Sequence, residues 1–454
     1  MDEAQSTTGG PNRRGAGADT PTAVAGTGAA PRRATWRLIG PGIVVAATGV
    51  GAGDLVATLV AGSTFGYTLL WAAVIGCLVK ISLAEATGRW HLATGRTLLD
   101  GWRSLGPWTT VYFAVYVVVW GFVYGATAMS SSALPLAALF PDLVDLKVWA
   151  IACGLLGLVM VWFNRYAVVE KIMMVFVGVM FVVVLVVAGL STPHLGETLA
   201  GLLPVLPDGS LLYTLGLIGG VGGTITMASY GYWVNAKGWT DSSWMRMMRL
   251  DNRVAYLTTG VFVVAMLIVG AELLHASQTA LTSGDRGLLD LGEILQERYG
   301  QVVAKLFLVG FFAASFSSLV GVWHGVSLLF ADFVERVRVA RLQRAGRVTS
   351  DGGAAEAVAR GLPERSLPFR AYLLWLTLAS LPLLWLDQPF GLVIVYGVLG
   401  ACFMPFLALT LLWLLNSSRT PREWRNGALS NVMLSVAGLL FLVLCVQQVR
   451  ELPW

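Results

Sequence analysis

Long apolar stretches separated by short polar segments run through almost the whole chain. Eleven of them are long enough to cross a hydrocarbon core of about 30 Å as helices. Their approximate bounds are 37–63, 66–90, 107–138, 148–163, 166–192, 210–236, 253–275, 300–333, 370–387, 389–415 and 427–449. They are continuously apolar, whereas the strands of a membrane barrel alternate in polarity. The pattern therefore predicts an all-α integral membrane protein with 11 transmembrane helices.

Composition and charge agree with a lipid environment. Of the 454 residues, 56% are hydrophobic and only 13% are charged, which would leave a soluble protein with too much apolar surface. Most of the 31 Lys and Arg residues lie in polar segments that would share one side of the membrane with the N-terminus. Positive charge accumulates on the cytoplasmic side, so we expect a multi-pass inner (plasma) membrane protein with a cytoplasmic N-terminus and an extracytoplasmic C-terminus. The same bias explains the basic charge without a nucleic-acid partner.

The remaining segments carry few signals of chemistry. Residues 1–36 are rich in Gly, Ala, Thr, Pro and Arg, and they lack an apolar signal sequence, which predicts a disordered cytoplasmic tail. Cys77, Cys153, Cys402 and Cys445 are scattered without a CxxC spacing, so we expect small buried residues and no disulfide. No nucleophile and base cluster together, so we expect no enzyme and no cofactor. We also expect the protein to work as a monomer.

Two of the apolar stretches are interrupted by glycines. The first contains the run 49–54 (Gly-Val-Gly-Ala-Gly-Asp) and the sixth contains the run 219–223 (Gly-Gly-Val-Gly-Gly). Each glycine costs a helix about 1 kcal/mol relative to alanine, although glycine also serves close helix packing in membranes. Matching interruptions in the first helix of each half are typical of inverted-repeat transporters. The predicted repeats are 37–192 and 210–415, each of five helices, with 427–449 as an additional helix.

An unwound segment in a membrane persists only where it lines a polar cavity, and its freed backbone groups then become ligands. Carbonyl oxygens suit cations and the N-terminal ends of half-helices suit anions, so the backbone alone leaves the sign of the substrate open. The predicted substrate-binding residues are Gly51, Ala52, Gly53, Asp54, Gly223, Thr224, Thr226, Met227, Ala228 and Ser229.

Charged groups inside the apolar stretches are functional candidates because burying them is costly. Asp54 is either a substrate or proton carboxylate or the N-cap of the second half of its helix. Lys80 and Glu85 lie five residues apart, and Lys80 either neutralises Asp54 or Glu85 or holds an anion. His324 is either a proton shuttle or a neutral packing residue.

Several motifs resemble one family of transporters. They are the runs 40–42 (Gly-Pro-Gly), 61–71 (Ala-Gly-Ser-Thr-Phe-Gly-Tyr-Thr-Leu-Leu-Trp), 92–96 (Leu-Ala-Thr-Gly-Arg), 311–319 (Phe-Phe-Ala-Ala-Ser-Phe-Ser-Ser-Leu) and 404–406 (Met-Pro-Phe). Together they resemble the Nramp family of divalent-metal transporters over residues 37–415. The resemblance implies a LeuT-type fold, a 5+5 inverted repeat with discontinuous helices 1 and 6, and inward transport of Mn²⁺ or Fe²⁺ with protons.

The site motifs of that family are only partly present. Its helix-1 sequence Asp-Pro-Gly-Asn falls on residues 51–54 (Gly-Ala-Gly-Asp), so the metal-binding Asp is missing and its Asn is replaced by Asp54. Its helix-6 sequence Met-Pro-His falls on residues 227–229 (Met-Ala-Ser), so the thioether remains and the histidine does not. The acids of helix 3 are absent from 117–125, and Gly397 lies near the site glutamine of helix 10.

Two hypotheses remain. The first is a carrier of a divalent cation (Mn, Fe or Mg), with Asp54 and Met227 as metal ligands and weak or no proton coupling. The second is a carrier of a small anion such as bicarbonate, held by backbone N–H groups with Lys80 or His324. The resemblance to the Nramp family slightly favours the hypothesis of a divalent-cation carrier.

Overall fold

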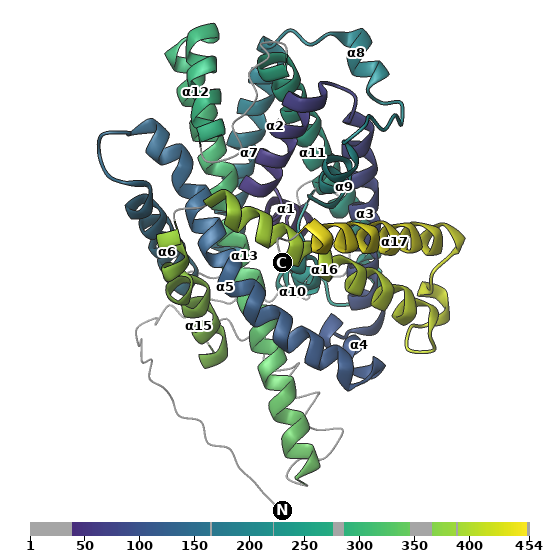
Figure 1. Ribbon diagram of the computed structural model, residues 1–454. Coiled ribbons are helices and arrows are strands. Elements are labelled where there is room, and N and C mark those ends of the chain that lie inside the picture. Colours follow the sequence, from purple (N-terminus) through teal and green to yellow (C-terminus); the bar gives the residue numbers. More distant parts are fainter. Residues whose placement is uncertain are drawn as a thin grey trace, which may run out of the picture.

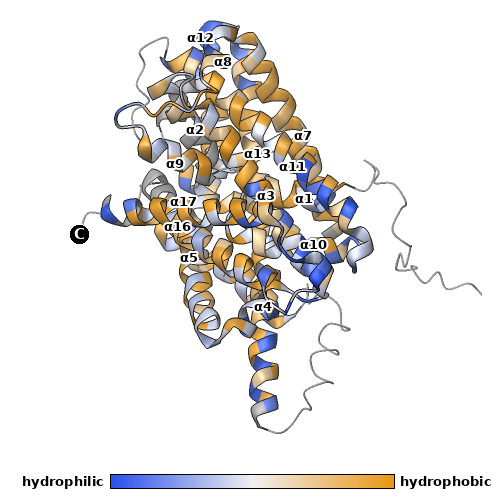
Figure 2. Ribbon diagram, turned by 90° about the vertical axis from the view of Figure 1, so that its right-hand side faces the viewer, coloured by the Kyte–Doolittle hydropathy of each residue, from blue (hydrophilic) through white to orange (hydrophobic). Residues whose placement is uncertain are grey.

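The computed structural model describes residues 39–163, 166–220, 222–275, 286–345, 366–386 and 389–451. The predicted N-terminal tail lies outside these residues, as do the side chains of residues 52–57. The described chain is a bundle of helices that run mostly between two ends (Figure 1). Along the bundle the helices are hydrophobic, and polar residues gather toward its ends and its connecting segments (Figure 2). This distribution is the one a lipid environment requires.

The first half of the bundle contains five predicted spans, the first of them in two pieces. Its helices are α1 (Pro41–Ala47), α2 (Ala52–Phe65), α3 (Leu70–Thr94), α5 (Pro107–Leu139), α6 (Leu146–Phe163) and α7 (Tyr166–Leu190). A short helix, α4 (Leu98–Leu105), follows α3 and begins with a capping box made by Thr97 and Asp100.

The second half repeats this order. Its helices are α9 (Leu211–Gly220), α10 (Tyr230–Ala236), α11 (Met245–Gly270), α13 (Gln301–Arg344), α15 (Leu367–Leu374) and α16 (Pro389–Asn416). Helix α17 (Ala428–Glu451) follows, and α8 (Leu195–Ala200) and α12 (Arg286–Tyr299) lie in connecting segments. Within the described residues, nine helical segments are long and apolar enough to cross a membrane. The predicted first span is broken into α1 and α2, and the predicted sixth span into α9 and α10, so their pieces are too short to be among the nine. Counted as one helix each, helix 1 and helix 6 bring the total to the predicted 11.

Helix 1 is broken between α1 and α2, and helix 6 is broken between α9 and α10. The first break covers Thr48–Gly51, so Ala52, Gly53 and Asp54 belong to the first turn of α2 and not to the unwound segment. In helix 6, α9 continues through Gly220, and the chain resumes as a 3₁₀ turn, η2 (Ile225–Ser229), that leads into α10.

The two breaks lie against each other in the interior. A Cβ atom added to Gly49 would lie 1.6 Å from the amide nitrogen of Gly223 and 2.1 Å from the carbonyl carbon of Gly222. Gly222 and Gly223 have φ values of 74° and 85°, a region that favours glycine. Glycine on both sides therefore lets two backbones from opposite halves of the chain meet.

We expect Gly49→Ala to destabilise the protein by about 1–3 kcal/mol, because the added methyl group forces the two backbones apart. The melting temperature of the purified protein measures the loss. Gly178→Ala is the control, since it lies on α7 and an added Cβ there would meet nothing within 4 Å. An equal melting temperature for the Gly49 variant and the control would contradict the close contact.

Candidate functional site

Hydroxyl groups connect the two breaks. The Thr48 hydroxyl in the first break donates to the Val45 carbonyl oxygen at 2.6 Å and shares a hydrogen bond of 2.7 Å with the Thr226 hydroxyl in η2. The Thr48 carbonyl oxygen, released by the break, accepts a hydrogen bond of 2.7 Å from Ser318 on α13. The Tyr124 hydroxyl on α5 lies 3.0 Å from the Ser318 hydroxyl. Both breaks and two further helices thus share one buried hydrogen-bond network.

The carbonyl groups of the helix-6 break are also bonded. The Tyr256 hydroxyl on α11 donates to the Gly222 carbonyl oxygen at 3.1 Å. The Lys80 ammonium on α3 donates to the Gly223 carbonyl oxygen at 2.5 Å. Lys80 is 0% exposed, and its ammonium lies 5.5 Å from the centre of the Phe441 ring. A buried positive charge is therefore placed at the point where the two breaks meet.

Lys80 reaches the break because α3 packs closely along helix 6. Gly76 lies one turn earlier on the same face of α3. A Cβ at Gly76 would lie 2.9 Å from the Cα atom of Ile218 on α9, so only glycine allows this approach. Cys77 Sγ lies 2.9 Å from the Tyr256 carbonyl oxygen on α11. The small residues of α3 thus determine how deep the lysine reaches.

The predicted site residues of helix 6 are brought to this junction. Thr226, Met227 and Ala228 are buried in η2 beside the first break. The Ser229 hydroxyl points elsewhere and donates to the Gly325 carbonyl oxygen of α13 at 2.9 Å. Thr224 precedes η2, and its methyl group would be 3.1 Å from a Cβ added to Gly400 on α16.

On helix 1, Gly51 faces Ser318, whose hydroxyl would be 2.8 Å from an added Cβ. The side chain of Asp54, the second predicted metal ligand beside Met227, lies outside the described residues. Among the side chains that the structure does describe, no group of three or more His, Cys, Asp or Glu residues gathers as a metal site would. The assignment of these residues to a substrate site stays a prediction.

The other two candidate side chains lie away from the junction. Glu85 pairs with Arg89 at 3.1 Å and with Arg249 of α11 at 2.9 Å. His324 on α13 is buried, and its Nδ1 atom accepts a hydrogen bond of 3.1 Å from the Trp233 indole N–H. That bond ties the ring to α10 and is in line with the packing interpretation of His324.

Sequence reasoning did not select Asp251, which holds the first half of helix 1. This carboxylate on α11 is 0% exposed and accepts hydrogen bonds from the backbone N–H groups of Gly40 at 2.9 Å and Gly42 at 2.5 Å. The Tyr230 hydroxyl also donates to it at 3.1 Å. A negative charge at the start of α1 satisfies N–H groups that the helix itself leaves unpaired. The Gly-Pro-Gly run at 40–42 was the available signal, because it allows this approach.

Further polar contacts tie α10 to its neighbours at the end of the bundle where α1 begins. We name this end, which carries Lys237 and Arg336, the basic end. Lys237, just after α10, pairs with Glu170 of α7 at 2.5 Å. The Tyr232 hydroxyl donates to Asp332 of α13 at 2.6 Å, and Arg336 bonds both Asp332 and Asp100 of α4. The sequence predicts that this end is cytoplasmic.

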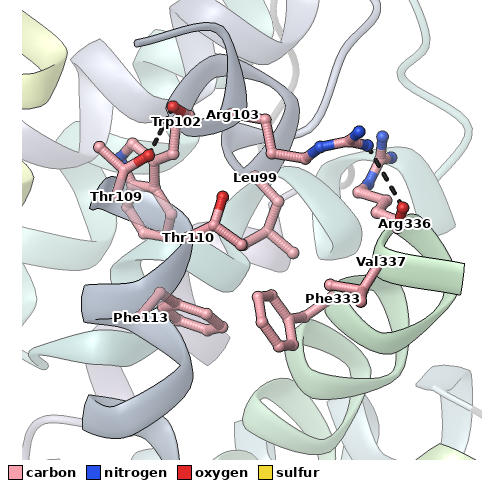
Figure 3. Close-up of a pocket in the computed structure, with 9 residues that line it drawn as sticks. All are labelled: Leu99, Trp102, Arg103, Thr109, Thr110, Phe113, Phe333, Arg336 and Val337. Atoms are coloured by element: carbon pink, nitrogen blue, oxygen red, sulfur yellow. Dashed lines mark hydrogen bonds between the residues drawn. The ribbon is translucent and has the colours of Figure 1, made fainter. Parts of the chain in front are cut away.

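A small pocket lies beside these contacts, between α4, the start of α5 and α13 (Figure 3). Phe113 and Phe333 face each other across it, while Arg103 and Arg336 lie at its edge. Arg103 donates to the Arg336 carbonyl oxygen. This pocket is separate from the junction of the breaks, whose side chains are buried.

Glu272 joins three segments at the opposite end. It lies in a π-helical turn, η4 (Ala271–His275), and accepts a hydrogen bond from the Tyr67 hydroxyl. His194, in the segment before α8, lies 2.9 Å from the same carboxylate. This hydrogen bond raises the pKa of the exposed His194 imidazole above its usual value.

Comparisons with known proteins agree on one group. A family model described as natural resistance-associated macrophage protein-like (Nramp) matches residues 42–450. The divalent metal cation transporter MntH of Chromohalobacter salexigens is 28% identical over 322 residues, which cover 65% of this chain and 70% of that protein. The protein of the same name from Klebsiella pneumoniae is 26% identical over 308 residues, with coverage of 64% and 71%.

Two solved structures share the fold. The manganese transporter of Eremococcus coleocola superposes with a TM-score of 0.74 at 17% identity, covering 94% of this chain and 92% of that one. Mhp1, a nucleobase-cation-symport-1 family transporter, superposes with a TM-score of 0.54 at 15% identity, covering 93% and 94%. The molecule is thus a membrane transporter with a LeuT-type fold, and not an enzyme. It belongs to the Nramp family.

We expect Asp251→Asn to release the first half of helix 1, because an amide N–H₂ group replaces one acceptor and leaves a buried backbone N–H unpaired, at a cost of about 1–3 kcal/mol. Hydrogen exchange of residues 40–47 should become faster. Asp241→Asn makes the same change at an exposed turn and serves as control. Unchanged exchange in the Asp251 variant would show that this carboxylate does not hold α1.

We expect the contact between His194 and Glu272 to weaken as pH rises. Because the pKa of His194 is raised in the folded protein, its contribution is fully present below the ordinary histidine pKa and is lost as pH rises through the folded-state pKa. Hydrogen exchange of residues 191–200, corrected for intrinsic rates, should be faster at about pH 9 than at about pH 5. His194→Gln should abolish the difference and His275→Gln should keep it; a difference that survives in the His194 variant contradicts the assignment.

Proposed function

We propose that this chain is a secondary-active carrier that moves a small inorganic ion across the plasma membrane by alternating access, and that the ion is a divalent metal cation. The observation that carries the proposal is the contact between the two breaks, Gly49 against Gly222 and Gly223. Carbonyl groups released from helices are ligands for cations, and lipid cannot satisfy them. The related proteins named divalent metal cation transporters support the choice of substrate.

The ligands at this junction suit a cation that keeps part of its water shell. The predicted ligand side chains are Asp54 and Met227, and the hydroxyl groups of Thr48 and Thr226 meet where the two breaks come together. Hydroxyl and carbonyl oxygens are typical ligands of Mg²⁺ or Mn²⁺, whereas soft metals prefer more nitrogen or sulfur. Within the proposed Mn, Fe and Mg class, the oxygen ligands favour Mg²⁺ and Mn²⁺, and the Met227 thioether adds nothing for Mg²⁺.

The contacts at the two ends support alternating access. Asp251 and the pair Lys237–Glu170 hold the half-helices at the basic end, and Glu272 joins segments at the opposite end. The bundle can open at the basic end by breaking the contacts of Asp251 and Lys237, while the contacts of Glu272 at the opposite end stay intact, and the reverse. We propose that the basic end is cytoplasmic, that the N-terminus lies on the same side and that the carrier works as a monomer.

We propose weak or absent proton coupling. Residues 117–125 of α5 contain no carboxylate, and Trp120 and Tyr124 stack there with ring centres 4.5 Å apart. Aromatic rings do not relay protons as carboxylates do.

A small anion such as bicarbonate is the second candidate, because Lys80 places a buried positive charge at the helix-6 break. An anion there would draw the ammonium away from the Gly223 carbonyl oxygen. In that case Lys80→Met abolishes uptake of bicarbonate into liposomes.

We expect purified protein in liposomes to take up Mn²⁺ or Mg²⁺, and Asp54→Ala to reduce the uptake at least about tenfold, because a carboxylate that ligates a cation contributes several kcal/mol. A lumenal pH dye should report no acidification during metal uptake. Asp241→Asn is the control for loss of one carboxylate. Metal uptake that survives in Asp54→Ala contradicts the assigned ligand, robust acidification contradicts the weak coupling, and bicarbonate uptake without metal uptake favours the second candidate.

A further inference from the structure

Lys80 combines features that a packing lysine does not have. Its side chain is 0% exposed, and its ammonium donates to the Gly223 carbonyl oxygen at 2.5 Å. An ammonium inside a membrane protein is costly unless it is bonded, so this contact is part of the fold. The carbonyl that it meets belongs to a break and has no helical N–H to accept from.

The surroundings of Gly223 are rich in oxygen atoms. A Cβ added to Gly223 would lie 2.8 Å from the Thr226 hydroxyl, 3.3 Å from the Thr48 hydroxyl and 3.3 Å from the Val45 carbonyl oxygen. Carbonyl and hydroxyl oxygens together can replace the water shell of an alkali cation. The ammonium itself is bonded to the Gly223 carbonyl oxygen, and these further oxygen atoms lie beside the Cα atom of the same glycine.

We propose that the Lys80 ammonium is a tethered cation: it fills a monovalent-cation position that the Gly223 carbonyl oxygen and the helix-6 break would otherwise offer to a free alkali ion. One positive charge and the size of an ammonium match one alkali ion. The chain thus carries its own cation at the junction of the breaks.

The tether has a consequence for transport that rests on the proposed function. A carrier whose break is stabilised by its own side chain can change between its outward and inward states without a bound coupling ion. A substrate cation that uses the Gly223 carbonyl oxygen must first displace Lys80. Lys80 is then a residue that determines specificity, because it excludes cations that bind too weakly to displace it.

Melting of the Lys80→Met variant tests the tether. Methionine fills a similar volume without charge, so the carbonyl position becomes vacant. The wild type and the variant are melted in N-methylglucamine chloride and in sodium or potassium chloride at about 0.15 M ionic strength, where general screening is equal. We expect the variant to melt several degrees below the wild type in the bulky cation and to recover roughly 2–4 °C in the alkali salts. The wild type should melt equally in all three.

Lys171→Met is the matched control, because it removes one positive charge from an exposed position on α7 and should show no dependence on the cation. If Lys80→Met does not fold, Lys80→Gln is measured in the same salts, since its shorter amide also leaves the position without a charge. Equal melting of the folded Lys80 variant in all salts overturns the proposal, and so does an alkali response of the wild type equal to that of the variant.

This experiment separates the tether from the proposed function. The melting temperature of the Lys80 variant in alkali salts shows whether a free cation fills the position that the lysine leaves. Metal uptake by the wild type shows separately whether the substrate is a metal. A rescued variant together with a wild type that takes up no metal would keep the tethered cation and discard the metal carrier.

Discussion

Lipid offers no hydrogen-bond partner, so every backbone group that helices 1 and 6 release where they unwind must find one inside the protein. The structure meets this demand with a different helix each time. Ser318 of α13 bonds the Thr48 carbonyl, Tyr256 of α11 bonds the Gly222 carbonyl and Lys80 of α3 bonds the Gly223 carbonyl. Three helices are therefore fixed in position around the breaks. The unwound segments are costly by themselves, and they are also the points that hold the bundle in register.

The same demand explains the polar contacts at the ends. The start of α1 is a short helix with unpaired N–H groups, and the buried Asp251 carboxylate satisfies two of them. This contact is strong because it is charge-assisted and shielded from water, but it joins only the start of α1 and, through Tyr230, the start of α10 to α11. A half-helix held by a few polar groups can detach as a unit without disturbing the apolar packing of α13 against α5 and α7. The contact of Glu272 with Tyr67 is the corresponding connection at the opposite end.

The sequence predicted the helices well and the details of the breaks less well. Continuous apolar stretches define membrane helices, so their positions follow from composition alone. A run of glycines permits unwinding but does not require it: α9 stays helical through Gly220, while the chain unwinds already at Thr48, before the first glycine of its run. The tertiary contact of Gly49 with Gly223 decides where each helix ends. Asp251 was missed because it lies 211 residues from Gly40 in a polar segment that reads as surface.

The resemblance to Nramp motifs gains a physical meaning from Lys80. The sequence predicts that the family's metal-binding Asp falls on Gly51 and its Asn on Asp54, so the carboxylate has moved along the helix, while Lys80 brings an ammonium group beside the other break. An ammonium at this place opposes the binding of a bare divalent cation. Under the proposed tether, the apparent affinity of a substrate cation would be its intrinsic affinity reduced by the cost of moving the ammonium from the Gly223 carbonyl oxygen, just as a rarely populated competent state reduces apparent affinity. If Lys80 is the proposed tethered cation, weak binding and easy release would follow from this one contact, which would suit an ion present at high concentration better than a scarce one.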